Sequence, residues 1–131
     1  MQLKSLGIIL LVISTILIAG CRTAPVHNVS DESITPWQTR DLSQDDVSKA
    51  IISAGQSLTW IMQEKEEGHI QGTLLLREHV AVVDIYYDKT KFSIKYKSSK
   101  NLNYDGTDIH RNYNNWIINL TNRINLHVSQ L

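Results

Sequence analysis

The sequence is poor in the residues that crosslink a chain or interrupt its secondary structure. Its 131 residues include one cysteine, two prolines and six glycines. A single cysteine excludes a disulfide within the chain. Thirteen basic residues balance thirteen acidic ones, so there is no basic excess of the kind that nucleic-acid binding requires. No internal repeat or low-complexity tract is present.

The sequence also lacks the common motifs of metal sites and catalytic centres. Its five histidines are not spaced as metal ligands: they are His27, His69, His79, His110 and His127. There is no Gly-x-Ser-x-Gly turn around a nucleophile and no glycine-rich phosphate loop. The sequence therefore predicts neither a metal nor any other cofactor.

One hydrophobic run stands out, from Leu6 to Ile18 behind the basic Lys4. Its length suits the apolar core of a signal peptide and is short for a stable transmembrane helix. The run ends in Ile18-Ala19-Gly20-Cys21, which resembles the lipobox of bacterial lipoproteins. An ordinary signal or a transmembrane anchor that happens to end in cysteine is the alternative. We interpret residues 1–20 as a lipoprotein signal peptide.

The lipobox resemblance implies that Cys21 is lipidated with diacylglyceryl and further acyl chains such as palmitate. Two or three chains anchor a protein durably, whereas a single chain binds a membrane only marginally. Arg22 follows Cys21, and the absence of aspartate there implies export to the outer membrane, facing the periplasm. Without Lys4 the mature chain carries 12 basic and 13 acidic residues, a formal charge of −1.

Residues 21–42 are expected to join the lipidated cysteine to the folded domain. The segment is polar, carries Pro25 and Pro36, and has no sustained hydrophobic period. We therefore predict a flexible tether, with Trp37 docking on the domain, inserting at the membrane interface or remaining exposed. The globular domain is expected to span residues 43–131.

Within that domain, apolar periodicity predicts an α+β fold in the order α-β-β-β-α. The pattern indicates a helix from Ser43 to Gly68, where Ser43 and Asp46 suit a capping box. Strands are expected at about 69–77, 80–87 and 91–97, and a second helix from about 107 to 127. We predict a three-stranded antiparallel meander with both helices packed on one face, in two layers.

Alternation of side chains sets the expected register of the meander. Tyr87 should oppose Phe92, and Asp84 should oppose Lys95. A turn at 78–79 should place Leu74 against Val83. The other face of the sheet would then hold an apolar cluster of four residues, Leu75, Val80, Val82 and Tyr86. These side chains could simply be exposed, could be covered by the tether, or could form a docking surface.

The stretch NLNYDGTDIHRNYNNWI, residues 101–117, is dense in functional groups. Its turn formers and its apolar stripe favour a strand-to-helix connection. A ligand- or partner-binding pocket and a catalytic site stay open as alternatives. Once the core residues of the stripe are set aside, the candidate binding residues are Tyr104, Asp105, His110, Arg111 and Asn114. We assign no catalytic residue.

The run from Ile94 through Ser99, Asn101, Tyr104 and His110 to Ile117 resembles small uncharacterised lipoproteins of the proteobacterial outer membrane. This resemblance implies an envelope location and carries no activity or catalytic residues. We therefore expect a non-enzymatic binding or assembly module with an envelope protein as partner. The alternative is a small envelope enzyme or ligand binder with a polar cleft around Tyr104, Asp105, His110 and Arg111.

Overall fold

A computed structural model describes residues 22–131. The lipobox and the predicted signal peptide lie outside the described residues. The elements in chain order are β1 (Thr23–Pro25), β2 (Val29–Ser33), the short 3-10 helix η2 (Thr35–Trp37), α2 (Gln44–Ser57), β3 (Ile61–Glu66), β4 (His69–Leu76), β5 (His79–Tyr87), β6 (Lys91–Lys100), β7 (Asp108–His110) and α3 (Arg111–Ser129).

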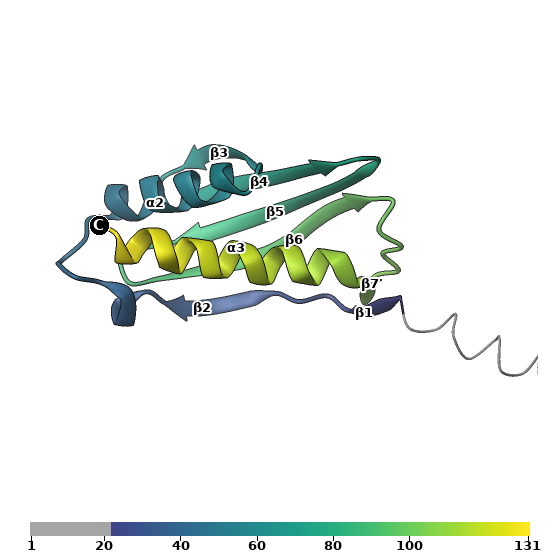
Figure 1. Cartoon of the computed structure of the whole chain (residues 1–131), viewed down its shortest axis with the longest axis horizontal. Coiled ribbons are helices and arrows are strands. Elements are labelled where there is room, and N and C mark those ends of the chain that lie inside the picture. Colours follow the sequence, from purple (N-terminus) through teal and green to yellow (C-terminus); the bar gives the residue numbers. More distant parts are fainter. Residues whose placement is uncertain (1–21) are drawn as a thin grey trace, which may run out of the picture.

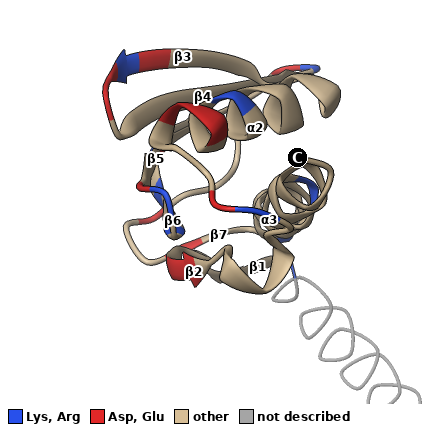
Figure 2. Cartoon of the chain, turned by 90° about the vertical axis from the view of Figure 1, so that its left-hand side faces the viewer, with Lys and Arg blue, Asp and Glu red and all other residues tan. Residues whose placement is uncertain are grey.

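The fold is α+β, as the sequence predicts. Five antiparallel strands form the main sheet in the order β2-β6-β5-β4-β3, and β1 pairs with β7 in a separate two-stranded sheet. Helices α2 and α3 lie along one side of the main sheet, and the sheet curves around them (Figures 1 and 2). The hydrophobic core fills the space between sheet and helices. The predicted meander is the centre of the sheet, β4-β5-β6, which β3 and β2 extend on either side.

One of the two predicted registers is confirmed and the other is wrong. Between β5 and β6, Tyr87 opposes Phe92 and Asp84 opposes Lys95, as predicted. Between β4 and β5, Leu74 opposes Ala81 and not Val83. The turn lies at residues 77–78, one position earlier than predicted, because Arg77 adopts a left-handed conformation with φ 56°. Moving the turn by one residue shifts the pairing by two, which keeps every side chain on its predicted face.

Helix α2 begins as predicted and ends much earlier. Ser43 accepts a hydrogen bond from the backbone N–H of Asp46, and the Asp46 carboxylate accepts one from the N–H of Ser43. The predicted continuation to Gly68 is wrong, because Ile61–Glu66 is the edge strand β3. A reversal at Thr59, with φ 69°, folds this strand back so that Met62 packs on Gly55. The spacing of Ile61 and Met62 from the helix was compatible with either structure.

The predicted flexible tether at 21–42 is also wrong for its described part. Residues 23–25 pair with β7, and residues 29–33 pair with β6 at the edge of the main sheet. Ile34 is fully buried in the core. The partners of these strands lie far away in the chain: Ser33 pairs with Lys91, and Thr23 pairs with His110. Only the tertiary structure therefore orders them. The folded unit therefore includes the segment from Arg22 to Leu42 and does not begin at Ser43.

Helix α3 starts at Arg111, later than predicted, because residues 108–110 form β7. Most of its predicted apolar stripe is confirmed, since Tyr113, Ile117, Leu120 and Ile124 are fully buried. Of the other two predicted members, Ile109 lies in β7 and Trp116 is half-buried, and Val128 extends the stripe. Within residues 22–131, no helix combines the length and apolarity that a membrane crossing demands.

Candidate functional site

The Asn114 side chain holds the N-terminal segment against the start of α3. Its Oδ1 accepts a hydrogen bond from the backbone N–H of His27 at 2.9 Å, and its Nδ2 donates to the carbonyl of Pro25 at 2.9 Å. Both of its amide groups are therefore occupied by backbone that lies nearly ninety residues away in the chain. Asn114 joins two segments and presents no free polar group to a ligand.

His110 and Arg111 also take part in backbone contacts at this joint. His110 is the N-cap of α3, where its ring Nδ1 accepts a hydrogen bond from the N–H of Asn112 at 3.1 Å. Its own backbone N–H donates to the carbonyl of Leu102. The N–H of Arg111 donates to the carbonyl of Arg22 at 3.1 Å. The Arg111 side chain is exposed.

Asp105 and Tyr104 belong to the loop that precedes β7. The Asp105 carboxylate accepts hydrogen bonds from the backbone N–H groups of Asp108 at 2.8 Å and Thr107 at 2.9 Å. These two donors, that of Asp108 foremost, lower the pKa of Asp105 below its ordinary value. Tyr104 packs its ring against Tyr96, with the centroids 4.2 Å apart. Both side chains thus stabilise the loop conformation.

The five candidate binding residues therefore lie in one region without converging on a shared cleft. Asn114, His110 and Asp105 bind the backbone, Tyr104 stacks on another ring, and Arg111 extends outward. The geometry favours the strand-to-helix joint over a polar cleft. The sequence identified the residues of this joint on the β7 and α3 segment, but it did not identify the β1 segment that they contact.

Beneath the joint lies a cluster of three tyrosines. The ring of Tyr96 contacts Tyr104 on one side and the edge of Tyr113 on the other, at 5.7 Å between centroids. The Tyr96 hydroxyl is 2.7 Å from Oγ of Ser99. The Tyr113 hydroxyl is fully buried and has no hydrogen-bond partner. Burial, aided by the two neighbouring phenols, raises the pKa of Tyr113 well above its ordinary value.

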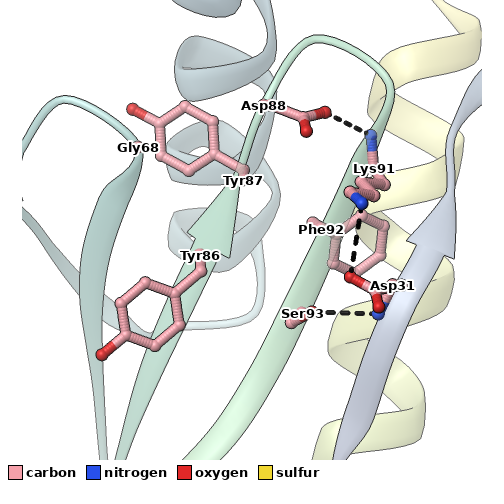
Figure 3. A pocket seen from close by; sticks show the side chains of 8 residues that line it. All are labelled: Asp31, Gly68, Tyr86, Tyr87, Asp88, Lys91, Phe92 and Ser93. Atoms are coloured by element: carbon pink, nitrogen blue, oxygen red, sulfur yellow. Dashed lines mark hydrogen bonds and ion pairs between the residues drawn. The ribbon is translucent and has the colours of Figure 1, made fainter.

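A hollow of about 180 Å³ lies at the opposite end of the sheet, around the β5–β6 turn (Figure 3). Asp31 from β2 lies across from Lys91, with Oδ1 and Nζ 3.8 Å apart, and its backbone N–H donates to Oγ of Ser93. The Asp88 carboxylate accepts hydrogen bonds from the backbone N–H groups of Thr90 and Lys91. The Asp31, Asp88, Lys91 and Ser93 groups of this hollow are thus engaged with one another or with nearby backbone.

Next to that hollow, Glu64 accepts hydrogen bonds from two hydroxyl groups. Ser48 Oγ donates to Glu64 Oε1 at 3.3 Å and Tyr87 OH donates to the same oxygen at 3.0 Å. Burial, the largest influence, raises the pKa of Tyr87. Sequence reasoning missed this contact because it placed Glu64 at a solvated helix end. If residues 61–66 had been predicted as a strand, Glu64 would have been expected on the face of the sheet that packs against the helices.

A groove runs along the exposed side of α3 and consists of two adjoining hollows. One of about 380 Å³ is lined by Leu58, Asn119, Asn122, Arg123 and Leu126. The other, of about 210 Å³, is lined by Trp37, Asn122, Asn125, Leu126 and Ser129. Asn125 is largely buried there, and its Oδ1 lacks a hydrogen-bond partner. We call these two hollows together the α3 groove.

Known proteins do not supply a family for this chain. Comparison with protein-family models, with curated proteins and with solved structures finds no match. Among residues 22–131, no cluster of three or more histidine, cysteine, aspartate or glutamate side chains is arranged to hold a metal ion. The α3 groove is the described feature that combines apolar surface with unused polar groups.

Proposed function

We propose that this protein is an envelope lipoprotein, anchored by lipid chains on Cys21 in the outer membrane and facing the periplasm. The observation that supports this proposal is that the residues directly after Cys21 already belong to the fold. The carbonyl of Arg22 is already hydrogen-bonded to Arg111, and β1 starts at Thr23. Cleavage before Cys21 would therefore keep all of the described residues, with the lipidated residue directly adjoining them.

We further propose that the protein is a non-enzymatic binding module whose α3 groove takes an extended segment of an envelope protein. Asn119, Asn122 and Asn125 recur at every third position of α3. Asparagine is a poor helix former, so three asparagines along one side of α3 are not explained by helix stability. Asn119 and Asn122 are exposed, and each of their amides offers one donor group and one acceptor, which matches the backbone of an extended peptide. The Asn125 side chain is buried at the floor of the groove, where its Nδ2 donates to Glu32 Oε1 at 3.5 Å.

The apolar parts of the groove suit the side chains of such a segment. Trp37 and Leu126 are 46% and 49% exposed, and both line the hollow that Asn125 also lines. The guanidinium of Arg123 donates to Ser57 at 3.0 Å. Because that cation has a partner and the other lining groups are uncharged, the groove favours an uncharged, partly apolar segment.

The anchor is tested by replacing Cys21 with serine and following processing and membrane fractionation in cells. Loss of acylation, with release or misprocessing of the protein, is the expected result. A Cys21→Ser protein that is still processed and still membrane-bound would overturn the lipoprotein assignment.

The groove is tested by placing a photo-crosslinking amino acid at Asn122 in intact cells, with Asn112 as control. Both positions are exposed asparagines of α3, but Asn112 lies outside the groove. We expect an envelope protein to crosslink at Asn122 alone, through one contiguous segment, and to be lost in a Leu126→Asp variant. The same adducts at both positions, or adducts that survive Leu126→Asp, would contradict the proposal.

A further inference from the structure

Three segments that are remote in sequence meet at the end of the molecule where the chain enters the fold. Asn101 donates through Nδ2 to the carbonyl of Glu78 at 2.7 Å, and its own carbonyl is 2.7 Å from Nδ1 of His79. Arg111 at the start of α3 binds the carbonyl of Arg22. The β4–β5 turn, the β6–β7 loop and the start of β1 therefore form one surface, at the right-hand end in Figure 1. We call it the anchor-proximal end.

Large apolar side chains are exposed at this end. Leu75 and Leu76 at the tip of β4 are 57% and 44% exposed, and Tyr104 in the β6–β7 loop is 41% exposed. Leu76 adjoins the β4–β5 turn, and Tyr104 lies in the loop that leads into β7, the partner of β1. Apolar side chains at the tips of a turn and a loop suit insertion among lipid headgroups.

The charges of the described residues are distributed unequally between the two ends. The anchor-proximal end carries four cations and three acids: Arg22, Arg77, Lys100 and Arg111, with Glu78, Asp105 and Asp108. None of these four cations takes part in an ion pair within residues 22–131.

The opposite end is acidic by comparison. In Figure 2, which views this end, the red segments that mark Asp and Glu lie on α2, β2 and β3. Nine acids are found there against five bases: Asp31, Glu32, Asp41, Asp45, Asp46, Glu64, Glu66, Glu67 and Asp88, with Arg40, Lys49, Lys65, Lys89 and Lys91. An anionic surface would therefore attract the anchor-proximal end and repel the other.

We propose that the anchor-proximal end is a lipid-contact surface that seats the domain directly on a phospholipid leaflet. Leu75, Leu76 and Tyr104 enter the headgroup region, while the arginines and Lys100 bind the lipid phosphates. This inference rests on the proposed anchor at Cys21, and it adds a fixed orientation of the domain relative to the membrane.

The short connection to Cys21 is a further reason to expect lipid as the occupant of this surface. Thr23 is the second residue after Cys21, so an extended chain between them spans roughly 7 Å. Lipid chains on Cys21 would hold the anchor-proximal end at the headgroups, which leaves no room for a protein between them. The α3 groove, which extends toward the C-terminus, would stay open to the periplasm (Figure 1).

The test uses the fact that Cys21 is the only cysteine. In the lipidated protein its sulfur is blocked, so a cysteine introduced elsewhere takes up a thiol-reactive fluorophore alone. We would label Leu76→Cys and, as a matched control, Leu126→Cys, since these leucines are 44% and 49% exposed at opposite ends. Each lipidated protein is reconstituted into vesicles of phosphatidylethanolamine and phosphatidylglycerol that carry a lipid-borne quencher.

We expect several-fold stronger quenching of the label at position 76 than at position 126. An Arg77→Ser, Lys100→Ser variant should lose much of that quenching when phosphatidylglycerol is present. Equal quenching at both positions in protein that floats with the vesicles would overturn the lipid-contact surface. Failure of the anchor gives a different result, because the protein without an added cysteine would then take up label at Cys21 and would not float.

Discussion

The backbone of His27 is bound to the side chain of Asn114 across the boundary between the N-terminal segment and α3. Oδ1 of Asn114 accepts the N–H of His27 at 2.9 Å while Nδ2 donates to Pro25. This contact fixes the course of the chain between β1 and β2. It thereby holds the segment that follows Cys21 against the start of α3.

Removal of this contact should destabilise the protein. We expect Asn114→Ala to lower the free energy of unfolding by about 0.5–1.5 kcal/mol, because it removes two hydrogen bonds to exposed backbone groups, which water can then satisfy. Asn115→Ala is the control, since that neighbouring side chain is exposed on the same helix and gains the same helix propensity. Urea denaturation measures both. Hydrogen exchange at residues 26–28 should rise in Asn114→Ala alone, and equal stability of the two variants would contradict the assigned role.

Gly55 is required by the close approach of Met62. A Cβ at position 55 would lie 2.4 Å from Sδ of Met62, so Gly55→Ala should cost about 1–3 kcal/mol of stability despite the better helix propensity of alanine. In a Met62→Ala background the same change should instead stabilise α2 by about 0.5–1 kcal/mol. A double-mutant cycle by chemical denaturation gives both values, and additive effects would refute the steric explanation.

The buried hydroxyl of Tyr113 should be dispensable for stability. Tyr113→Phe removes a group without a hydrogen-bond partner, so we expect a change within about 0.5 kcal/mol or a slight gain. Tyr96→Phe is the comparison, because it removes the 2.7 Å contact with Ser99 and should cost about 0.5–1.5 kcal/mol. A large loss in Tyr113→Phe would mean that this hydroxyl binds an ordered group, such as a water molecule.

Acidification should weaken the loop that precedes β7. The folded pKa of Asp105 is lowered by the N–H donors of Asp108 and Thr107, so its contribution to stability is complete above the unfolded value, near 3.8. That contribution is lost as the pH falls below 3.8 and through the folded pKa. Asp105→Asn should reduce the fall in unfolding free energy over this range, as measured by urea denaturation at several pH values. An unchanged pH profile would exclude Asp105 as one of the responsible groups.

The sequence by itself determined those features that depend on neighbouring residues. The capping box at Ser43 and Asp46, the alternation of β5 and β6, and the apolar stripe of α3 are local patterns, and each is present in the structure. The same local reasoning identified residues 101–117 as dense in polar groups and interpreted them as a joint between strand and helix. It identified only one of the two segments that meet there.

Tertiary structure decided everything that depends on contacts between distant residues. Residues 23–33 have no alternating apolar pattern of their own, and they form strands because they pair with β7 and β6. The end of α2 at Ser57 is determined by Met62 packing on Gly55, since residues 61–66 suit a helix or a strand equally well. Asn114 has a structural role because the fold brings Pro25 and His27 within hydrogen-bond distance of it. A contact between residues so far apart in the chain cannot be predicted from the residues next to Asn114.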